Sequence, residues 1–370
     1  MIREGLSVRR LVVKVGSSSL AGADGRLDDA QVRALAGELA AVRRNGVSVV
    51  LVSSGAIAAG LDPLGMRRRP SDIPSLQAAA SVGQGLLMHA YQRAFARRRA
   101  PVGQVLLTQD DFIRRKGYLN AHHALERLLE LGVVPIVNEN DTVAVDEIRF
   151  GDNDRLAALV SMMLRADLLV ILSDVDGVYS ADPKQRGARL LTRVDDLATL
   201  SELRMGKASS PLGSGGMASK VESVRVAGAA GTGVVIANAR TPNILRRILA
   251  GEEIGTFFPA HRGRGRSRKL WIEFAQNTRG TIIVDEGAKQ ALVSAGKSLL
   301  PAGVRGHRGS FAIGDAVEVA GPDGAVFAKG ISNYGADEIP EIQGSSIRNG
   351  GREIIHRDSL VILSDGANRR

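Results

Sequence analysis

The chain of 370 residues has no cysteine, few aromatic residues and no long apolar segment. Without cysteine it can form no disulfide, no thiolate metal site and no cysteine nucleophile, and this composition suits a reducing cytoplasm. No apolar run approaches the roughly 18 residues that a membrane-spanning helix needs, and residues 1–10 mix charged with apolar side chains instead of forming a signal-peptide core. We therefore expect a cytoplasmic protein that neither spans nor crosses a membrane.

Length and hydrophobic content predict two domains. A hydrophobic fraction of 44% over this length is sufficient for one large core and one smaller core. We place a first domain at 1–260, a linker at 261–277, a second domain at 278–357 and a tail at 358–370.

The net charge is positive, but it is unevenly distributed. A formal charge of +10 and a pI near 10.2 are typical of proteins that bind nucleic acids. Residues 278–370 contain 11 basic and 11 acidic residues, however, so the whole excess lies before them. Half of that excess is in residues 261–269, the first part of the linker, in Arg262, Arg264, Arg266, Arg268 and Lys269. Basic residues among glycines are better explained as a flexible, solvated linker.

Short β-branched segments alternate with helical segments in the first domain, which predicts an α/β fold with a mostly parallel sheet. The expected strands are 11–15, 47–52, 102–107, 133–138, 168–172 and 234–238. The expected helices, from apolar residues spaced three or four apart, are 28–44, 76–98, 118–131, 155–164 and 217–230. In the second domain we expect a small, mainly β structure with strands at 271–274, 280–284, 311–313, 316–319 and 326–332.

Two loops that follow expected strands combine glycine with lysine or serine. Because ligands of open α/β sheets bind beyond the carboxyl ends of the strands, these loops are candidate sites. Lys14 lies near the end of the first strand, two residues before Gly16, so it could hold a phosphoryl group beside accessible backbone amides, or be an exposed strand residue. Ser53, Ser54 and Gly55 follow the second strand, where they could bind a carboxylate or phosphate, or cap the next helix.

Two further turns are unusually rich in Asn and Asp. Residues 138–141 read Asn-Glu-Asn-Asp, and residues 151–154 read Gly-Asp-Asn-Asp. Their amide donors and carboxylate acceptors could together bind the ammonium and carboxylate groups of one ligand. Each turn taken separately could also be purely structural, because Asn and Asp are common turn formers.

The segment 213–220 is rich in glycine and opens an expected helix, with Lys220 one turn inside it. Accessible amides at a helix start, followed by a lysine, predict a phosphate-binding loop. The segment is not a Walker A loop, because Lys220 follows serine instead of glycine. A dinucleotide-binding fold is also a poor interpretation, because no strand leads into the segment and the next strand ends without an acidic residue.

No metal site is predicted. The segment 173–179 resembles part of a calcium loop but lacks its spacing, and it fits a nucleotide-facing loop better. His122, His123 and Glu126 are better explained as a solvated helix face than as metal ligands.

Taken in order, these motifs resemble the glutamate kinases of the amino acid kinase family. The segments that carry the resemblance are 13–18, 52–60, 138–141, 151–154 and 215–220. Residues 278–356, with the segments 284–288 and 298–303, resemble the PUA domain that many bacterial members carry. The resemblance implies a three-layer α/β/α kinase domain with a mostly parallel sheet, followed by a small, mainly β PUA domain.

The resemblance also implies an activity: transfer of the ATP γ-phosphoryl group to the side-chain carboxylate of L-glutamate, the first step of proline biosynthesis. Lys14 and Lys220 would stabilise the transferring group, and Asp154 would orient both lysines. Glutamate would be bound by Ser54, Gly55, Asp141 and Asn153. ATP would be bound by Lys14, Gly16, Ser173, Asp174, Ser214, Gly215, Gly216, Met217, Ala218, Ser219 and Lys220. Mg²⁺ is expected on the nucleotide phosphates.

Feedback inhibition by proline and a homo-oligomeric state are further expectations from the family. The chain departs from the family in having serine at positions 53, 173 and 214, which should change packing more than chemistry. Rival interpretations are family members that act on N-acetylglutamate, aspartate, carbamate or a nucleoside monophosphate. RNA binding is another, because PUA domains in other proteins bind structured RNA, but the balanced charge of 278–370 argues against it.

Overall fold

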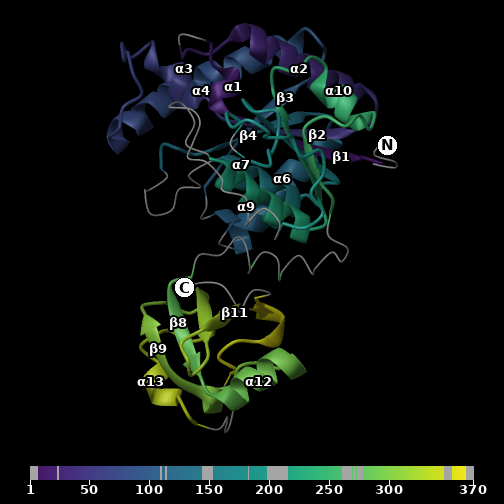
Figure 1. Cartoon of the computed structure of the whole chain (residues 1–370). Coiled ribbons are helices and arrows are strands. Elements are labelled where there is room, and N and C mark those ends of the chain that lie inside the picture. The colour runs from purple at the N-terminus through teal and green to yellow at the C-terminus, as the bar shows by residue number, and fades with distance from the viewer. Residues whose placement is uncertain are drawn as a thin grey trace. The chain divides into compact units, whose positions relative to one another are not determined.

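The computed structural model describes residues 7–22, 25–108, 111–112, 115–143, 153–181, 183–197, 216–260, 269, 272, 278–345 and 352–363. The chain divides into two compact units, Met1–Arg264 and Gly265–Arg370 (Figure 1). Among the described residues, no helix is long and apolar enough to cross a membrane.

The first unit is built on a seven-stranded sheet with the order β3-β4-β2-β1-β5-β6-β7. Its strands are β1 (Arg10–Val15), β2 (Ser48–Ser53), β3 (Val102–Leu107), β4 (Val134–Glu139), β5 (Leu168–Ser173), β6 (Gly233–Asn238) and β7 (Thr256–Phe258). The first six are parallel and lie within one residue of the predicted strands, whereas β7 runs antiparallel to β6. The strand β7 escaped prediction because three residues are too few to show a periodic pattern.

Helices cover both faces of this sheet (Figure 1). One layer contains α2 (Asp29–Arg44), α4 (Ile73–Ala96) and α10 (Ile244–Leu249), and the opposite layer contains α6 (Arg115–Glu130), α7 (Asn153–Met163) and α9 (Met217–Ala229). Two short helices, α1 (Ser17–Leu20) and α3 (Ala56–Leu61), directly follow β1 and β2. Because helices bury both faces, the central strands are near-continuous apolar runs. The predicted three-layer α/β/α architecture is confirmed.

Helix α7 is the most enclosed element of this unit. Ten of its 11 residues are buried, including the polar Asn153 and Asp154 at its start. A helix that is apolar nearly all round must lie inside the molecule, and α7 packs against β1, β5 and α9. The start of α7 therefore brings two polar side chains into a dry interior.

Helices α3 and α4 are in backbone contact through two glycines. A Cβ atom on Gly83 would lie 1.8 Å from the Ala56 carbonyl oxygen, and one on Gly60 would lie 1.9 Å from the Ala79 carbonyl oxygen. No side chain fits in such a space, so α3 keeps its place against α4 only with glycine at both positions.

The substitution Gly83→Ala is expected to destabilise the first unit. The added methyl group forces α3 away from α4, and overpacking of this kind costs about 1–3 kcal/mol or more. The matched control is Gly85→Ala on the same helix, where the new Cβ meets nothing within 4 Å. There the better helix propensity of alanine should raise stability by about 0.5–1 kcal/mol. Urea unfolding of the three proteins measures both effects, and equal midpoints would contradict the close-contact argument.

Arg98 links α2 to α4 through two carbonyl oxygens. Its Nη1 donates to Ala94 at 2.9 Å and its Nη2 donates to Arg33 at 3.2 Å. Gly37 leaves room for this guanidinium, because a Cβ there would lie 2.8 Å from Nη2.

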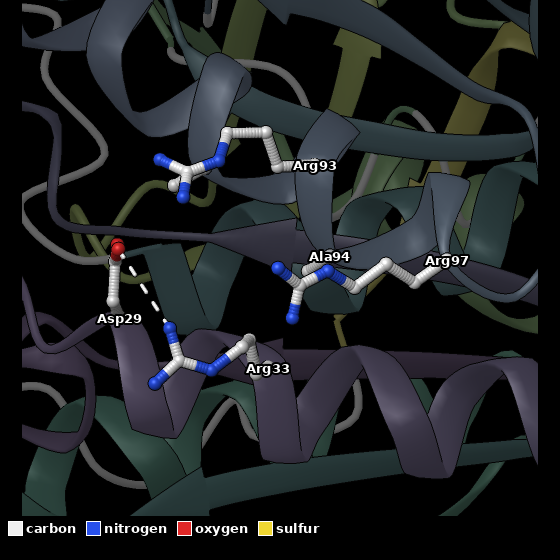
Figure 2. Close-up of a pocket in the computed structure, with 6 residues that line it drawn as sticks. Asp29, Arg33, Arg93, Ala94 and Arg97 are labelled. Atoms are coloured by element: carbon white, nitrogen blue, oxygen red, sulfur yellow. Dashed lines mark ion pairs between the residues drawn. The ribbon is translucent and has the colours of Figure 1, made fainter.

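Beside the Arg98 link, side chains of α2 and α4 line a small pocket. Figure 2 shows that Arg33 from α2, Arg93 from α4 and Arg97, which directly follows α4, line it, and a carboxylate oxygen of Asp29 lies 3.8 Å from the Arg33 guanidinium. Part of the basic excess of the first unit thus lies on this exposed surface.

The second unit contains a five-stranded sheet with the order β12-β11-β10-β8-β9. Its strands are β8 (Gly280–Val284), β9 (Val304–Gly309), β10 (Ala316–Ala320), β11 (Val326–Ile331) and β12 (Leu360–Ile362). The helix α12 (Glu286–Ala295) follows β8 and begins at Asp285, whose side chain accepts from the Ala288 amide. Buried side chains of the strands and of α12 form a core within this unit. The expectation of a small, mainly β domain is confirmed.

Several elements of the second unit differ from prediction. The expected strand at 311–313 is wrong, because Phe311 follows the left-handed Gly309 and buries its ring in the core from a loop. The strand β9 was missed because its polar sequence alternates no apolar residues, and it becomes a strand by pairing with β8. The helix α12 and the strand β12 were also not predicted. The expected strand at 271–274 falls almost wholly outside the described residues.

Candidate active site

The order of the strands places a candidate site at the carboxyl end of β1. From β1 the chain moves to β2 on one side, and later to β5 on the other side. In open α/β sheets ligands bind where the strand order reverses in this way, beyond the carboxyl ends of the strands. The strands β1, β2, β4 and β5 are parallel, so the loops that follow them all begin at this edge of the sheet.

A buried carboxylate lies between two lysines at this edge. The Nζ atom of Lys14, from β1, is 2.5 Å from Asp154 Oδ1, and the Nζ atom of Lys220, from α9, is 3.1 Å from Asp154 Oδ2. The Asp154 side chain is fully buried, and the two lysine side chains are 4% and 9% exposed. Three separate segments of the sequence thus meet in one charged cluster.

This cluster suits an anionic ligand. Two ammonium groups share one carboxylate, so the three side chains together carry one positive charge in a nearly dry place. Charges held there by the fold act more strongly than in water and need no rearrangement when negative charge develops on a ligand. A transferring phosphoryl group is the kind of species that such a pair of lysines stabilises.

The loop after β1 approaches the cluster closely. A Cβ atom on Gly16 would lie 3.6 Å from the Lys14 Nζ atom, so the ammonium group lies against the Gly16 backbone. Ser173 ends β5, and the pairing of Val15 with Leu172 places Ser173 level with Gly16. The Ser173 hydroxyl donates to Asp174 Oδ1 at 3.1 Å. The loops after β1 and β5 are therefore neighbours.

The start of α9 provides backbone donors beside Lys220. Gly216 precedes the helix with an extended backbone and no side-chain cap, and the first turn has no acidic residue. The first amides of a helix lack intrahelical partners and favour anions. Met217, Ala218 and Ser219 form this turn, with Lys220 at its end. The predicted ATP-binding residues Ser214 and Gly215 lie outside the described residues.

A network of amides lies on the other side of Asp154, at the ends of β2 and β4. Asn153 Nδ2 donates to Ser54 Oγ at 2.9 Å and to Asn138 Oδ1 at 2.9 Å. The Ser54 amide donates to the Val15 carbonyl at 3.1 Å, which ties the end of β2 to the end of β1. Gly55 follows with a φ of 108°, a left-handed conformation that favours glycine. The two Asn/Asp-rich turns predicted from the sequence therefore meet through Asn138 and Asn153.

Asp141 lies in the turn after β4, three residues beyond Asn138. It follows Asn140, whose amide donates to the Leu107 carbonyl at 2.9 Å, so the turn after β4 is held against the end of β3.

The predicted residues Lys14, Asp154 and Lys220 form one cluster, and Ser54 and Asn153 form a second. Because Asn153 and Asp154 are adjacent at the start of α7, the two clusters adjoin.

Sequence reasoning missed two residues of α4 that contact these strand ends. Gln84 Oε1 accepts from Asn138 Nδ2 at 2.8 Å, and the Tyr91 hydroxyl shares a hydrogen bond of 2.8 Å with Ser53 Oγ. Burial raises the pKa of the Tyr91 phenol, so the ring remains neutral in this contact. Gln84 and Tyr91 are seven residues apart and therefore lie on one face of the helix. Two polar residues on the sheet-facing side of an apolar helix were the signal that could have revealed them.

The described residues contain no group of three or more His, Asp or Glu side chains that could hold a metal ion. His122 instead lies 3.6 Å from Glu126, and Glu126 forms a two-pronged ion pair with Arg10 at 2.7 and 2.9 Å.

Comparison with known proteins identifies the family. The model of the amino acid kinase family matches residues 9–238, and that of the PUA domain matches residues 280–350. The chain belongs to the amino acid kinase family.

Curated relatives match over nearly the whole chain. The chain is 52% identical over 364 residues to the glutamate 5-kinase of Streptomyces coelicolor, covering 96% of both chains. It is 49% identical over 369 residues to the glutamate 5-kinase of Thermobifida fusca, covering 97% of this chain and 94% of that one. It is 46% identical over 367 residues to the glutamate 5-kinase of Syntrophotalea carbinolica, covering 96% and 97%.

Proposed function

We propose that the chain transfers the γ-phosphoryl group of ATP to the side-chain carboxylate of L-glutamate. The products are L-glutamyl 5-phosphate and ADP, and the reaction is the first step of proline biosynthesis. The observation that carries the proposal is the buried Lys14–Asp154–Lys220 cluster at the reversal point of the sheet. The nearly full-length relatives named glutamate 5-kinase support the choice of substrate.

In the proposed reaction an oxygen of the glutamate side chain attacks the γ-phosphorus, and the bond from that phosphorus to the β–γ bridging oxygen breaks. Negative charge is spread over the transferring group, so the protein contributes position and charge. Lys14 and Lys220 are the groups that neutralise this charge. Asp154 holds both ammonium groups within reach of each other, which supports its role as their orienting residue.

Glutamate is bound, in this proposal, by Ser54, Gly55, Asp141 and Asn153. ATP is bound on the other side of the lysines by the loops at Gly16, at Ser173 and Asp174, and at 214–220. Mg²⁺ accompanies the nucleotide and is held mainly by its phosphates, as hard cations usually are in kinases. The uncapped start of α9 supports the placement of phosphates there.

We further propose a cytoplasmic homo-oligomer that proline inhibits, in keeping with the family expectation. RNA binding by the PUA domain is not favoured, because the charge of 278–370 is balanced.

The test is ADP release from Mg-ATP with glutamate, N-acetylglutamate or aspartate, with hydroxylamine present to trap an acyl phosphate as a hydroxamate. Glutamate-dependent ADP release with hydroxamate formation is the expected result, and added proline should then reduce the rate. Turnover of another acid instead would agree with the family assignment but contradict glutamate as the proposed substrate. No turnover with any acid would remove the proposal and make RNA binding, measured against salt concentration, the next experiment.

A further inference from the structure

We propose that Gln84 is a positioning residue that fixes which end of the Asn153 amide faces bound glutamate. Through a chain of three amides, Gln84 keeps the Asn153 carbonyl oxygen available for the substrate ammonium group. This inference rests on the proposed function and adds a determinant of its selectivity for a free amino group.

Asn138, the middle amide of the chain, is held between a backbone donor and Gln84. The Glu139 amide donates to Asn138 Oδ1 at 2.9 Å, and a backbone N–H needs an acceptor. This contact identifies the oxygen of the Asn138 side chain without reference to the other amides. Because Asn138 is buried, its Nδ2 group must then find an acceptor on its opposite side.

Gln84 supplies that acceptor. Its Oε1 accepts from Asn138 Nδ2 at 2.8 Å, and its own Nε2 is buried with no partner in the part of the chain that the structure describes. A buried donor without a partner costs free energy. Turning the Gln84 amide over would bring Nε2 against Nδ2, two donors face to face. Gln84 therefore offers its oxygen to Asn138 while its own Nε2 has no partner, and this acceptor holds the Asn138 amide in the direction that the Glu139 amide also requires.

The orientation of the Asn138 amide also determines the orientation of the Asn153 amide. Asn138 Oδ1 can only accept, so Asn153 presents Nδ2 to it, and this nitrogen also donates to Ser54 Oγ at 2.9 Å and approaches the Ser53 carbonyl at 3.3 Å. Three acceptors occupy one end of the Asn153 amide. The carbonyl oxygen is the end that remains for a ligand, and an oxygen accepts only from a donor.

A free amino acid brings such a donor in its α-ammonium group. A cationic donor strengthens the hydrogen bond, whereas a ligand without the amino group leaves the Asn153 oxygen without this partner. Sites built on a substrate N–H group reject analogues that lack it much better than apolar pockets reject a missing methylene group. The amide chain is therefore suited to select glutamate over glutarate.

The experiment compares kcat/KM for glutamate with kcat/KM for glutarate, the same diacid without the amino group. In Gln84→Met the side chain keeps its length but loses the acceptor, and Gln84→Ala serves as a second variant that removes it without adding bulk. In both we expect the preference for glutamate to fall about tenfold or more, through a higher KM for glutamate. The KM for ATP should stay within about twofold of wild type.

Two further variants complete the test. Gln84→Glu retains an acceptor for Asn138 and should keep most of the preference. Gln92→Met, on an exposed position of the same helix, is the matched control and should behave as wild type. An unchanged preference for glutamate in Gln84→Met and Gln84→Ala, or an equal loss of kcat/KM for both diacids, would overturn the inference. The proposed function would still stand in that case, provided that the wild-type protein phosphorylates glutamate. If wild type does not phosphorylate glutamate, the proposed function itself fails.

Discussion

Replacing Asp154 by asparagine is expected to lower kcat at least a hundredfold and to destabilise the first unit. Asparagine has the same size but no charge, so Lys14 and Lys220 lose the carboxylate that lies 2.5 and 3.1 Å from their ammonium groups. Misplacing charges that act on a transferring group costs about 10²–10³ in rate, by analogy with the loss of one oxyanion donor. Breaking a buried ion pair by removing one partner costs about 3–5 kcal/mol.

Steady-state kinetics and urea unfolding measure these two losses separately. The matched control is Asp62→Asn, because Asp62 forms an ion pair of 2.7 Å with Arg26 while both side chains are more than half exposed. An exposed pair of this kind contributes no more than about 1 kcal/mol, so activity and stability should change little. Wild-type turnover in Asp154→Asn would contradict the role assigned to the carboxylate.

Replacing Lys220 by alanine is expected to lower kcat by about 10²–10³, while the KM for glutamate changes less than about threefold. The Lys220 side chain is 9% exposed and its ammonium group contacts Asp154, whereas the residues proposed to bind glutamate lie at the ends of β2 and β4 and at the start of α7. Loss of a charge that acts mainly on the transition state should therefore appear in turnover, not in glutamate binding.

Lys220→Arg tests the shape of this cation. A guanidinium is planar and larger than an ammonium, so the arginine should restore only a small part of the rate in so enclosed a place. Arg225→Ala is the control on the same helix, because Arg225 is partly exposed and pairs with Glu222 at 2.7 Å. An unchanged kcat in Lys220→Ala, or a loss confined to the KM for glutamate, would remove Lys220 from phosphoryl transfer.

The central parallel strands could be predicted to within one residue because a strand buried on both faces must be continuously apolar. The same reasoning failed for β9, where a polar segment becomes a strand through the hydrogen bonds of its neighbour β8. It also failed for Phe311, whose burial from a loop imitates a strand residue. In both cases tertiary contacts overrode the local pattern.

Part of the candidate site could also be predicted from the sequence. Residues at the carboxyl ends of parallel strands and at helix starts have predictable positions, so Lys14, Ser54 and Lys220 could be nominated from their context. Gln84 and Tyr91 were missed, because they lie in the middle of a helix and reach the site across the packed layer between α4 and the sheet. Their polarity on one face of an apolar helix is the only local sign of them.

Local sequence is enough to define the alternation of strands and helices, the class of the fold and the loops that could bind a phosphate, because each depends on hydrophobic periodicity and backbone chemistry within a few residues. The packing of distant segments defines the chemistry of the site. Asp154 comes to lie between Lys14 and Lys220 because α7 packs against both β1 and α9. The amide of Asn153 contacts Ser54 after β2 and Asn138 on β4, and Asn138 in turn contacts Gln84 on α4. Charges and hydrogen bonds act over a few ångströms, and the fold alone brings these residues within that range.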